Sequence, residues 1–227
     1  LMFDGSPIEF GIDLSLEFSG LKIARLKRGV AIDQPLLQFE SLSLLPARQQ
    51  RRFQEKIRER LSQRIEELRA LSALPQGGAL SFALKRHLGV VPLSEVDTLL
   101  SEFSPLQIKH LQRQRIWKVE GYLLSSSVYK RANVKLRLAL AALWCGEDSL
   151  PDFPSRMVSP TVSWSKELAN LLGYRMVDER AVRKDVLFRL KGTARSGLTL
   201  SAAASQLGVR KKEAKTMLTK LGFRVEG

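Results

Sequence analysis

The stretch that decides the C-terminal fold runs from Leu198 to Val225 and reads LTLSAAASQLGVRKKEAKTMLTKLGFRV. Two sets of apolar residues recur there at the three- and four-residue spacing of a helix face. They are Leu200, Ala203, Ala204 and Leu207, then Ala214, Met217, Leu218 and Leu221. Gly208 stands between the two sets and suits the left-handed conformation that often ends a helix. The stretch therefore predicts a helical hairpin that resembles a helix-turn-helix.

The second helix of this hairpin is expected to present cations to solvent. Its predicted nucleic-acid-binding residues are Arg210, Lys211, Lys212 and Lys215, and Lys220 is also expected to be exposed. Lysine and arginine contact phosphate, which adds affinity without sequence information. Reading base edges takes Asn, Gln, Ser or Arg at the front of the helix, where only Arg210 and Lys211 qualify. The pattern favours backbone binding over sequence-specific binding to DNA.

Positive charge is the strongest compositional feature of the 227-residue chain. Its formal net charge is +14 and its isoelectric point is about 10.3. Two segments carry the excess: residues 181–227 hold 11 Lys/Arg against 3 Asp/Glu, and residues 107–137 hold 8 against 1. This segregation favours a polyanionic partner, nucleic acid before an anionic membrane surface. The alternative for each segment is a solvated charged face.

The basic middle segment also contains aromatic residues. Bases stack on aromatic rings, so cations interleaved with aromatics favour single-stranded nucleic acid. The predicted binding residues are Lys109, Arg113, Arg115, Trp117, Lys118, Lys130 and Arg131, with Tyr122 nearby. In the alternative interpretation, Trp117 and Tyr122 are core residues of a strand.

The N-terminal 45 residues predict a small β unit. Apolar residues alternate with polar residues or Gly from Ile8 to Phe18, which is the period of a half-buried strand. We expect a second strand at Leu21–Leu26, a turn at Lys27–Gly29 and a third strand at Val30–Ile32, closed by Pro35. These elements predict an antiparallel hairpin or a partial barrel.

Helices fill most of the remaining sequence. A long helix is expected from Pro46 to just before Pro75, with an apolar stripe of Phe53, Ile57, Leu61, Ile65, Leu68 and Leu71. Ser94 and the Ser104-Pro105 pair are predicted helix starts. Further expected elements are helices at Leu80–Leu88, Tyr129–Cys145, Trp164–Leu172 and Glu179–Leu190, and a strand at Arg115–Leu124. The predicted fold class is α+β, predominantly helical, in three segments: 1–45, 46–146 and 147–227.

Motifs for catalysis are missing from the sequence. It has no Gly-x-x-x-x-Gly-Lys-[Ser/Thr] loop, no Gly-x-Gly-x-x-Gly and no nucleophile elbow. Cys145 is the single cysteine, and His87 and His110 lack ligand spacing, so no cysteine-based zinc site is expected. The acidic loop 146–154 is typical of a solvated linker. We expect this chain by itself to be no enzyme and to hold no cofactor or metal.

The sequence shows neither a membrane-spanning segment nor a signal peptide. No apolar run reaches the ~18–20 residues that a bilayer span needs, so no membrane partner is expected. The chain opens Leu-Met-Phe-Asp-Gly, which is typical of neither a signal peptide nor a native start. We therefore expect a fragment of a longer protein, whose opening residues do not reveal its targeting.

Several stretches from about Ser19 onward carry a resemblance to a known family. They are GLKIARLKRGVAIDQPLL, RIEELRAL, GALSFALKRHLGVVPLSEV, LQRQRIWKVEGYLL, KLRLALAALW, LGYRMVDERAVRKDVLFRL and LGVRKKEAKTMLTKLGFRV. Their order resembles the region after the motor core of bacterial Suv-three-like DExH-box helicases, relatives of the mitochondrial degradosome RNA helicase. The resemblance implies a parent, located in the bacterial cytoplasm, that unwinds RNA, or an RNA–DNA or DNA duplex, with ATP and Mg. Its catalytic residues would lie upstream, in a motor core of the same polypeptide.

Three functions follow as hypotheses. The first is an accessory C-terminal module of an ATP-dependent helicase that guides single-stranded RNA or DNA. The second is a transcription factor whose helical hairpin reads the major groove, which predicts dimerisation and preference for one duplex. The third is a protein–protein scaffold whose charge serves solubility, which predicts little nucleic-acid binding at physiological salt.

Overall fold

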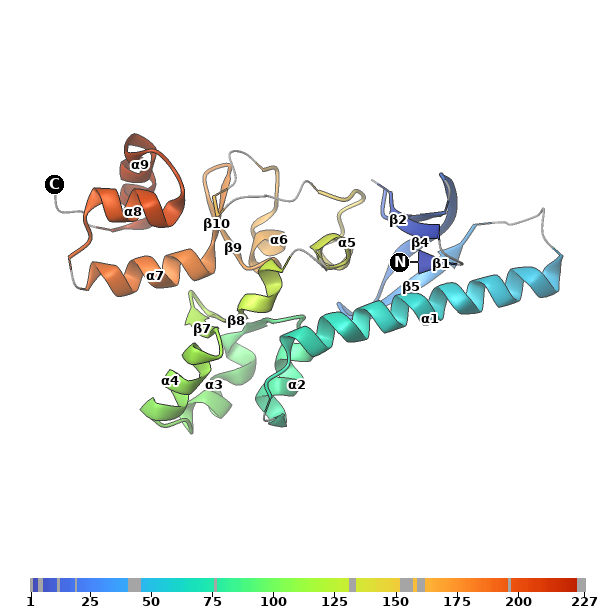
Figure 1. Cartoon of the computed structure of the whole chain (residues 1–227), viewed down its shortest axis with the longest axis horizontal. Helices are drawn as coiled ribbons and strands as arrows, with labels where there is room; N and C mark the ends of the chain where they lie inside the picture. The colour runs from blue at the N-terminus through green and yellow to red at the C-terminus, as the bar shows by residue number, and fades with distance from the viewer. Residues whose placement is uncertain are drawn as a thin grey trace. The chain divides into compact units, whose positions relative to one another are not determined.

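The structure, a computed structural model, describes residues 2–3, 6–11, 13–18, 20–40, 46–75, 77–130, 134–151, 157–158, 162–195 and 197–223 (Figure 1). It contains both helices and antiparallel strands, so the predicted α+β fold is confirmed. The chain divides into two compact units. The first unit comprises Leu1–Gly89 and Ser127–Pro151, and the second comprises Val90–Ser126 and Asp152–Gly227. The sequence-based division into three segments stays a prediction.

An antiparallel sheet forms the first part of the first unit. Its strands follow one another in sequence order: β1 (Met2–Phe3), β2 (Ser6–Phe10), β3 (Ser15–Phe18), β4 (Leu21–Ala31) and β5 (Gln34–Phe39). Leu16, Ile23 and Ala24 are buried on the face where Ile57 packs. This burial removes apolar surface from water, which stabilises the unit by roughly 25 cal/mol per Å².

The predicted single strand Ile8–Phe18 is wrong, because the chain turns between Gly11 and Leu14. The segment forms β2 and β3, which pair Ile8 with Phe18 and Phe10 with Leu16. Both strands of an antiparallel pair keep a period of two, so alternation alone does not reveal where one strand turns into the next.

The predicted turn at Lys27–Gly29 is also wrong, since β4 continues to Ala31 and includes most of the predicted third strand. The pairing of β4 with β5 shifts between Lys27 and Ala31, as in a β-bulge. Gly29 fits there because a Cβ would lie 1.7 Å from the carbonyl oxygen of Gln34. Pro35 lies within β5 and does not close the region, which an edge strand tolerates.

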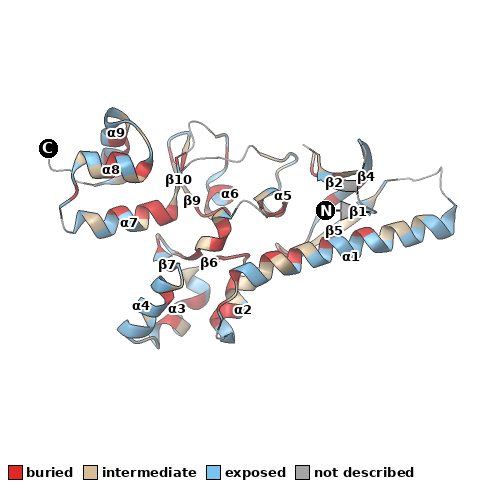
Figure 2. Cartoon of the chain, in the orientation of Figure 1, coloured by how far each residue is buried: buried red, intermediate tan, exposed pale blue. Residues whose placement is uncertain are grey.

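Helices complete the first unit: α1 (Ala47–Ser72), α2 (Gly78–Arg86) and α5 (Val134–Trp144). The predicted start of α1 at Pro46 is confirmed, and its buried positions Ile57, Leu61, Ile65 and Leu68 follow the predicted stripe. Pale blue marks the exposed face of α1 in Figure 2. Of the helix predicted at Tyr129–Cys145, the structure describes α5 from Val134 to Trp144; Tyr129 belongs to a 3-10 helix, Ser126–Tyr129, and residues 131–133 lie outside the described residues.

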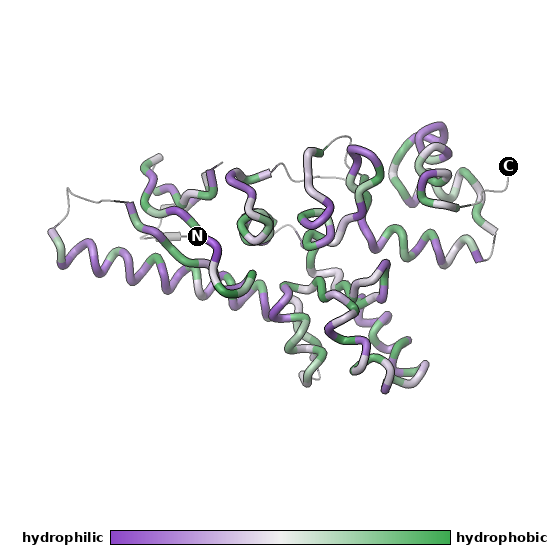
Figure 3. Tube along the Cα trace, turned by 180° about the vertical axis from the view of Figure 1, so that it is seen from behind, coloured by the Kyte–Doolittle hydropathy of each residue, from purple (hydrophilic) through white to green (hydrophobic). Residues whose placement is uncertain are grey.

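The second unit combines two small sheets with short helices. Its elements are β6 (Val90–Pro92), α3 (Leu93–Ser101), α4 (Pro105–Arg113), β7 (Ile116–Val119), β8 (Tyr122–Ser125), α6 (Lys166–Leu171), β9 (Tyr174–Val177), β10 (Arg180–Arg183), α7 (Lys184–Ala194), α8 (Leu200–Leu207) and α9 (Lys211–Leu221). One sheet has the order β6-β8-β7, and β9 pairs with β10 in a hairpin. Figure 3 shows green apolar and purple polar residues mixed along α7 and α9, and their buried residues recur at the three- and four-residue spacing of a helix face.

The cap predicted at Ser104-Pro105 is confirmed as a capping box. Ser104 Oγ accepts from the Gln107 N–H at 3.3 Å, and Gln107 Oε1 accepts from the Ser104 N–H at 2.7 Å. The predicted N-cap at Ser94 is wrong, because Pro92 precedes a helix that already begins at Leu93. Pro92 also belongs to β6, so the chain enters this helix directly from a strand.

Two other expectations in the second unit are corrected. The predicted strand Arg115–Leu124 is a hairpin, β7 and β8, which turns at Glu120-Gly121 with φ of 49° and 81°. The predicted helix Glu179–Leu190 begins only at Lys184, because Arg180–Arg183 forms β10. In both stretches strand residues lie beside a short turn that sequence periodicity does not separate from its surroundings.

Candidate nucleic-acid interface

The predicted helical hairpin at the C-terminal end is confirmed in α8 and α9. Gly208 ends α8 with φ 66° and ψ 34°, the left-handed conformation that its position predicts. Thr199 begins α8 by accepting, through Oγ1, a hydrogen bond from the Ala202 N–H at 3.3 Å. The backbone N–H of Val209 donates to the carbonyl of Ala204 at 3.1 Å and closes the turn.

A shared core holds these two helices against α7. Its buried residues include Val186 and Leu190 of α7, Leu207 of α8, and Met217 and Leu218 of α9. Three helices packed through one core, with a tight turn before the last, are the arrangement of a helix-turn-helix. The buried side of α9 is therefore fixed, and its other side is left to solvent.

The solvent side of α9 carries lysines that hold no acidic partner. Lys211, Lys212 and Lys215 are exposed, and none of them forms an ion pair with any residue that the structure describes. Arg210, also exposed, precedes the helix, and its backbone N–H donates to Glu213 Oε2 at 3.3 Å. These cations stand at the N-terminal end of a helix, where the macrodipole adds further positive potential.

Two neighbouring cations are already paired. Lys220 forms an ion pair with Asp178, and Arg180 lies 3.5 Å from Glu213. These four residues and Lys212 line a hollow of about 290 Å³ between α9 and the β9–β10 turn. Three cations and two carboxylates give this lining a net charge of +1, so the cationic character of α9 continues into the hollow.

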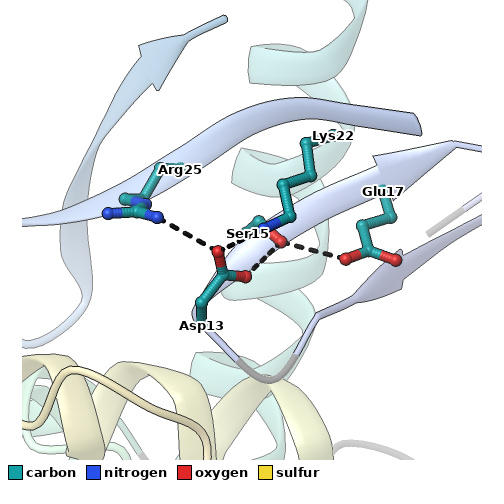
Figure 4. A network of polar contacts seen from close by, with 5 residues as sticks. All are labelled: Asp13, Ser15, Glu17, Lys22 and Arg25. Carbon is teal, nitrogen blue, oxygen red and sulfur yellow. Dashed lines mark hydrogen bonds and ion pairs between the residues drawn. The ribbon is translucent and has the colours of Figure 1, made fainter. Parts of the chain in front are cut away.

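In the first unit, by contrast, two basic side chains are paired with the carboxylate of Asp13 (Figure 4). It accepts from Lys22 Nζ at 2.7 Å, Arg25 Nη2 at 3.0 Å and Ser15 Oγ at 2.6 Å. The hydrogen bond from Lys22 is the largest reason why the pKa of Asp13 is lowered, and the same contact raises the pKa of Lys22. Lys22 and Arg25 are thus held by a carboxylate, whereas Lys211, Lys212 and Lys215 of α9 have none among the described residues.

The structure brings together only part of the predicted binding residues of the basic middle segment. Lys109 and Arg113 are exposed on α4, and Arg115 is exposed in the turn that follows, at φ 60°. Lys118 on β7 is exposed but lies 3.2 Å from Asp97. Lys130 belongs to the first unit, and Arg131 lies outside the described residues. That these residues bind nucleic acid together stays a prediction.

Both aromatic residues of this segment have protein neighbours. Trp117 is half-buried, and its ring centroid lies 6.1 Å from that of Phe188 on α7. The ammonium of Lys184 lies 3.6 Å from the centre of the Tyr122 ring. These contacts favour the alternative in which the two rings pack within the unit, while base stacking on Trp117 stays a prediction.

Lys184 itself is a residue whose role the sequence does not reveal. It is 1% exposed, and its Nζ donates to Asn170 Oδ1 at 2.9 Å. Burial lowers the pKa of Lys184 to about 8 by penalising its charged form, against the attraction of Glu120. Glu120 in turn accepts a hydrogen bond from Arg175, so one polar cluster links the β7–β8 and β9–β10 hairpins.

The described residues were also compared with the requirements of a metal site and of a membrane span. No group of three or more His, Cys, Asp or Glu side chains there is placed to hold a metal ion. No helix in the same ranges is both long and apolar enough to cross a bilayer. Comparisons with family models, curated proteins and solved structures found no match to this chain.

Proposed function

We propose that this chain is an accessory nucleic-acid-binding region of an ATP-dependent helicase and guides single-stranded RNA or DNA. The observation that carries the binding is the solvent face of α9, where Lys211, Lys212 and Lys215 are exposed and hold no ion-pair partner among the described residues. The helicase parent, with its ATP and Mg, is supported by the sequence resemblance alone. The proposed location is the bacterial cytoplasm.

The chemistry of this face favours binding without sequence preference. Lysine is a flexible point charge that contacts phosphate oxygens, and each contact releases counterions from the nucleic acid. Thr216 and Thr219 stand on the same face, but their hydroxyls donate to carbonyls of their own helix at 3.2 and 3.0 Å. The face therefore offers charge for the backbone and few groups for base edges.

The test is a fluorescence-anisotropy titration with random-sequence single-stranded RNA, single-stranded DNA and duplex DNA. The variant carries Lys211→Glu, Lys212→Glu and Lys215→Glu. We expect affinity for single strands to fall tenfold or more, and the slope of log K against log salt to shrink by about 2, because about three phosphate contacts are lost.

A charge-matched control separates this face from net charge. Arg48→Glu, Arg51→Glu and Arg52→Glu make the same charge change on exposed positions of α1. We expect the control variant to bind nearly as well as the parent chain. Equal losses in both variants, or none in either, would reject α9 as the binding face.

One observation favours a second candidate, a protein that reads duplex DNA. The packing of α7, α8 and α9 around one core leaves α9 exposed as a recognition helix would be. This candidate predicts selective binding to one duplex over random duplex in the same titration. Negligible binding to every probe would favour the scaffold hypothesis instead.

A further inference from the structure

A groove in the first unit differs from the rest of the chain in its charge. It lies between β5 and α1 and encloses about 1010 Å³. The buried side chains of Leu61 and Ile65 form part of its floor. Its charged lining comprises Arg58 and Arg69 against Asp33, Glu59 and Glu66, which is a net charge of −1. A groove with net negative charge does not attract nucleic acid, even though the whole chain carries +14.

One wall of this groove is an unprotected sheet edge. β5 is the last strand of its sheet, and among the described residues only β4 pairs with it. Its sequence, QPLLQF, contains no charged residue, although edge strands commonly carry lysine or other charges that block further pairing. Leu36 at its centre is 61% exposed. Pro35 removes one backbone donor from this edge, and no described strand other than β4 pairs with its remaining backbone groups.

A buried carboxylate at the start of the groove has one oxygen without a hydrogen-bond donor among the described residues. Asp33 is 6% exposed, and its Oδ2 lies 3.3 Å from Nε of Arg69. Arg69 is shared with Glu66, at 3.2 Å, so these three groups sum to one negative charge. Neither Oδ1 of Asp33 nor Nε of Arg69 has a hydrogen-bond partner among the described residues. Buried carboxylate oxygens are rarely left unsatisfied, so Oδ1 points to a missing cationic donor.

We propose that this groove binds an extended segment of a partner protein, which adds a strand to β5 and places a lysine or arginine against Asp33. The edge supplies backbone hydrogen bonds, while Leu36, Leu61 and Ile65 supply apolar contacts. A second copy of the chain fits less well, because its own β5 has no cation to offer Asp33. The proposal is independent of nucleic-acid binding at α9.

The experiment uses short fluorescein-labelled peptides of alternating Thr and Val, with one Lys scanned through the positions. A matched panel carries Gln in place of Lys. We expect the peptide with Lys at one particular position to bind about tenfold more tightly than the peptide with Gln there, because its ammonium group forms a hydrogen bond with the Asp33 carboxylate. Asp33→Asn should remove this preference. N-methylation of alternate amides on the edge facing β5 should abolish binding.

Two variants test the position of the added strand. Leu36→Lys places a charge on the exposed edge and should weaken every peptide about tenfold. Val30→Lys is the control, since Val30 is 87% exposed on β4 and does not line the groove. The proposal is overturned if Leu36→Lys leaves the peptide affinity unchanged, or if peptides with Lys bind no more tightly than peptides with Gln. A dimer in light scattering that Leu36→Lys dissociates would also overturn it, because the occupant would then be a second copy.

Discussion

Burial of one lysine gives the second unit a specific dependence on pH. In the folded state the pKa of Lys184 is lowered to about 8 by desolvation, whereas the unfolded chain keeps the ordinary value of 10.5. Between these values the unfolded chain binds the extra proton, so the free energy of unfolding rises with pH. The pKa of Tyr122 is raised by burial from 10.0, which makes stability fall again above about pH 10.

We therefore expect stability to rise from pH 8 to about pH 9.5, with a slope of at most about 1.4 kcal/mol per pH unit. Lys184→Met keeps the length of the side chain without its charge, and should remove this rise. Urea unfolding followed by circular dichroism at several pH values measures it. Lys166→Met, at an exposed position of α6, is the control and should keep the parent slope. A slope that survives in Lys184→Met would contradict the assignment.

At the scale of elements, two glycines predict opposite effects of the same substitution. Gly29 lies in the β4–β5 bulge, where a Cβ would meet the Gln34 carbonyl oxygen at 1.7 Å. Gly29→Ala should lower the free energy of unfolding by about 1–3 kcal/mol. Gly192 lies within α7, where an added Cβ would have no atom within 4 Å. Gly192→Ala should therefore raise the free energy of unfolding by up to about 1 kcal/mol. Denaturant titration of both variants measures the contrast, and a stable Gly29→Ala would rule out the close approach.

The same elements show what the sequence predicts and what it leaves open. Helices with a long apolar stripe or a capping box, such as α1 and α4, follow from local spacing and local hydrogen bonds. Gly208 likewise marks the α8–α9 turn by its own conformational preference. The turn at Gly11–Leu14 and the bulge at Gly29 depend on which strands pair, and that is decided by residues distant in sequence. The burial of Lys184 depends on packing between elements, which no local pattern encodes.

At the scale of the whole molecule, one strongly basic chain carries two surfaces of different chemistry. The solvent face of α9 presents lysines that no described carboxylate neutralises, whereas the groove beside β5 has a net charge of −1. The first suits a phosphate backbone and the second suits a basic peptide strand. Net charge alone favours a polyanionic partner for both surfaces, whereas the local charge favours one only at α9. Only the arrangement of the carboxylates Asp33, Glu59 and Glu66 distinguishes the two.

The net charge should also make thermal stability depend on salt, wherever the charges lie on the surface. A charge of +14 repels itself in the compact state, so added salt should raise the midpoint of thermal unfolding by screening this repulsion. Three Lys-to-Glu changes on α9, or three Arg-to-Glu changes on α1, each lower the charge from +14 to +8. Both variants should show a similarly reduced salt effect in differential scanning fluorimetry between about 0.05 and about 0.5 M NaCl. Nucleic-acid affinity, by contrast, should fall only in the α9 variant. A salt effect on unfolding that changes in one variant alone would show that local ion pairs, and not overall repulsion, control the stability.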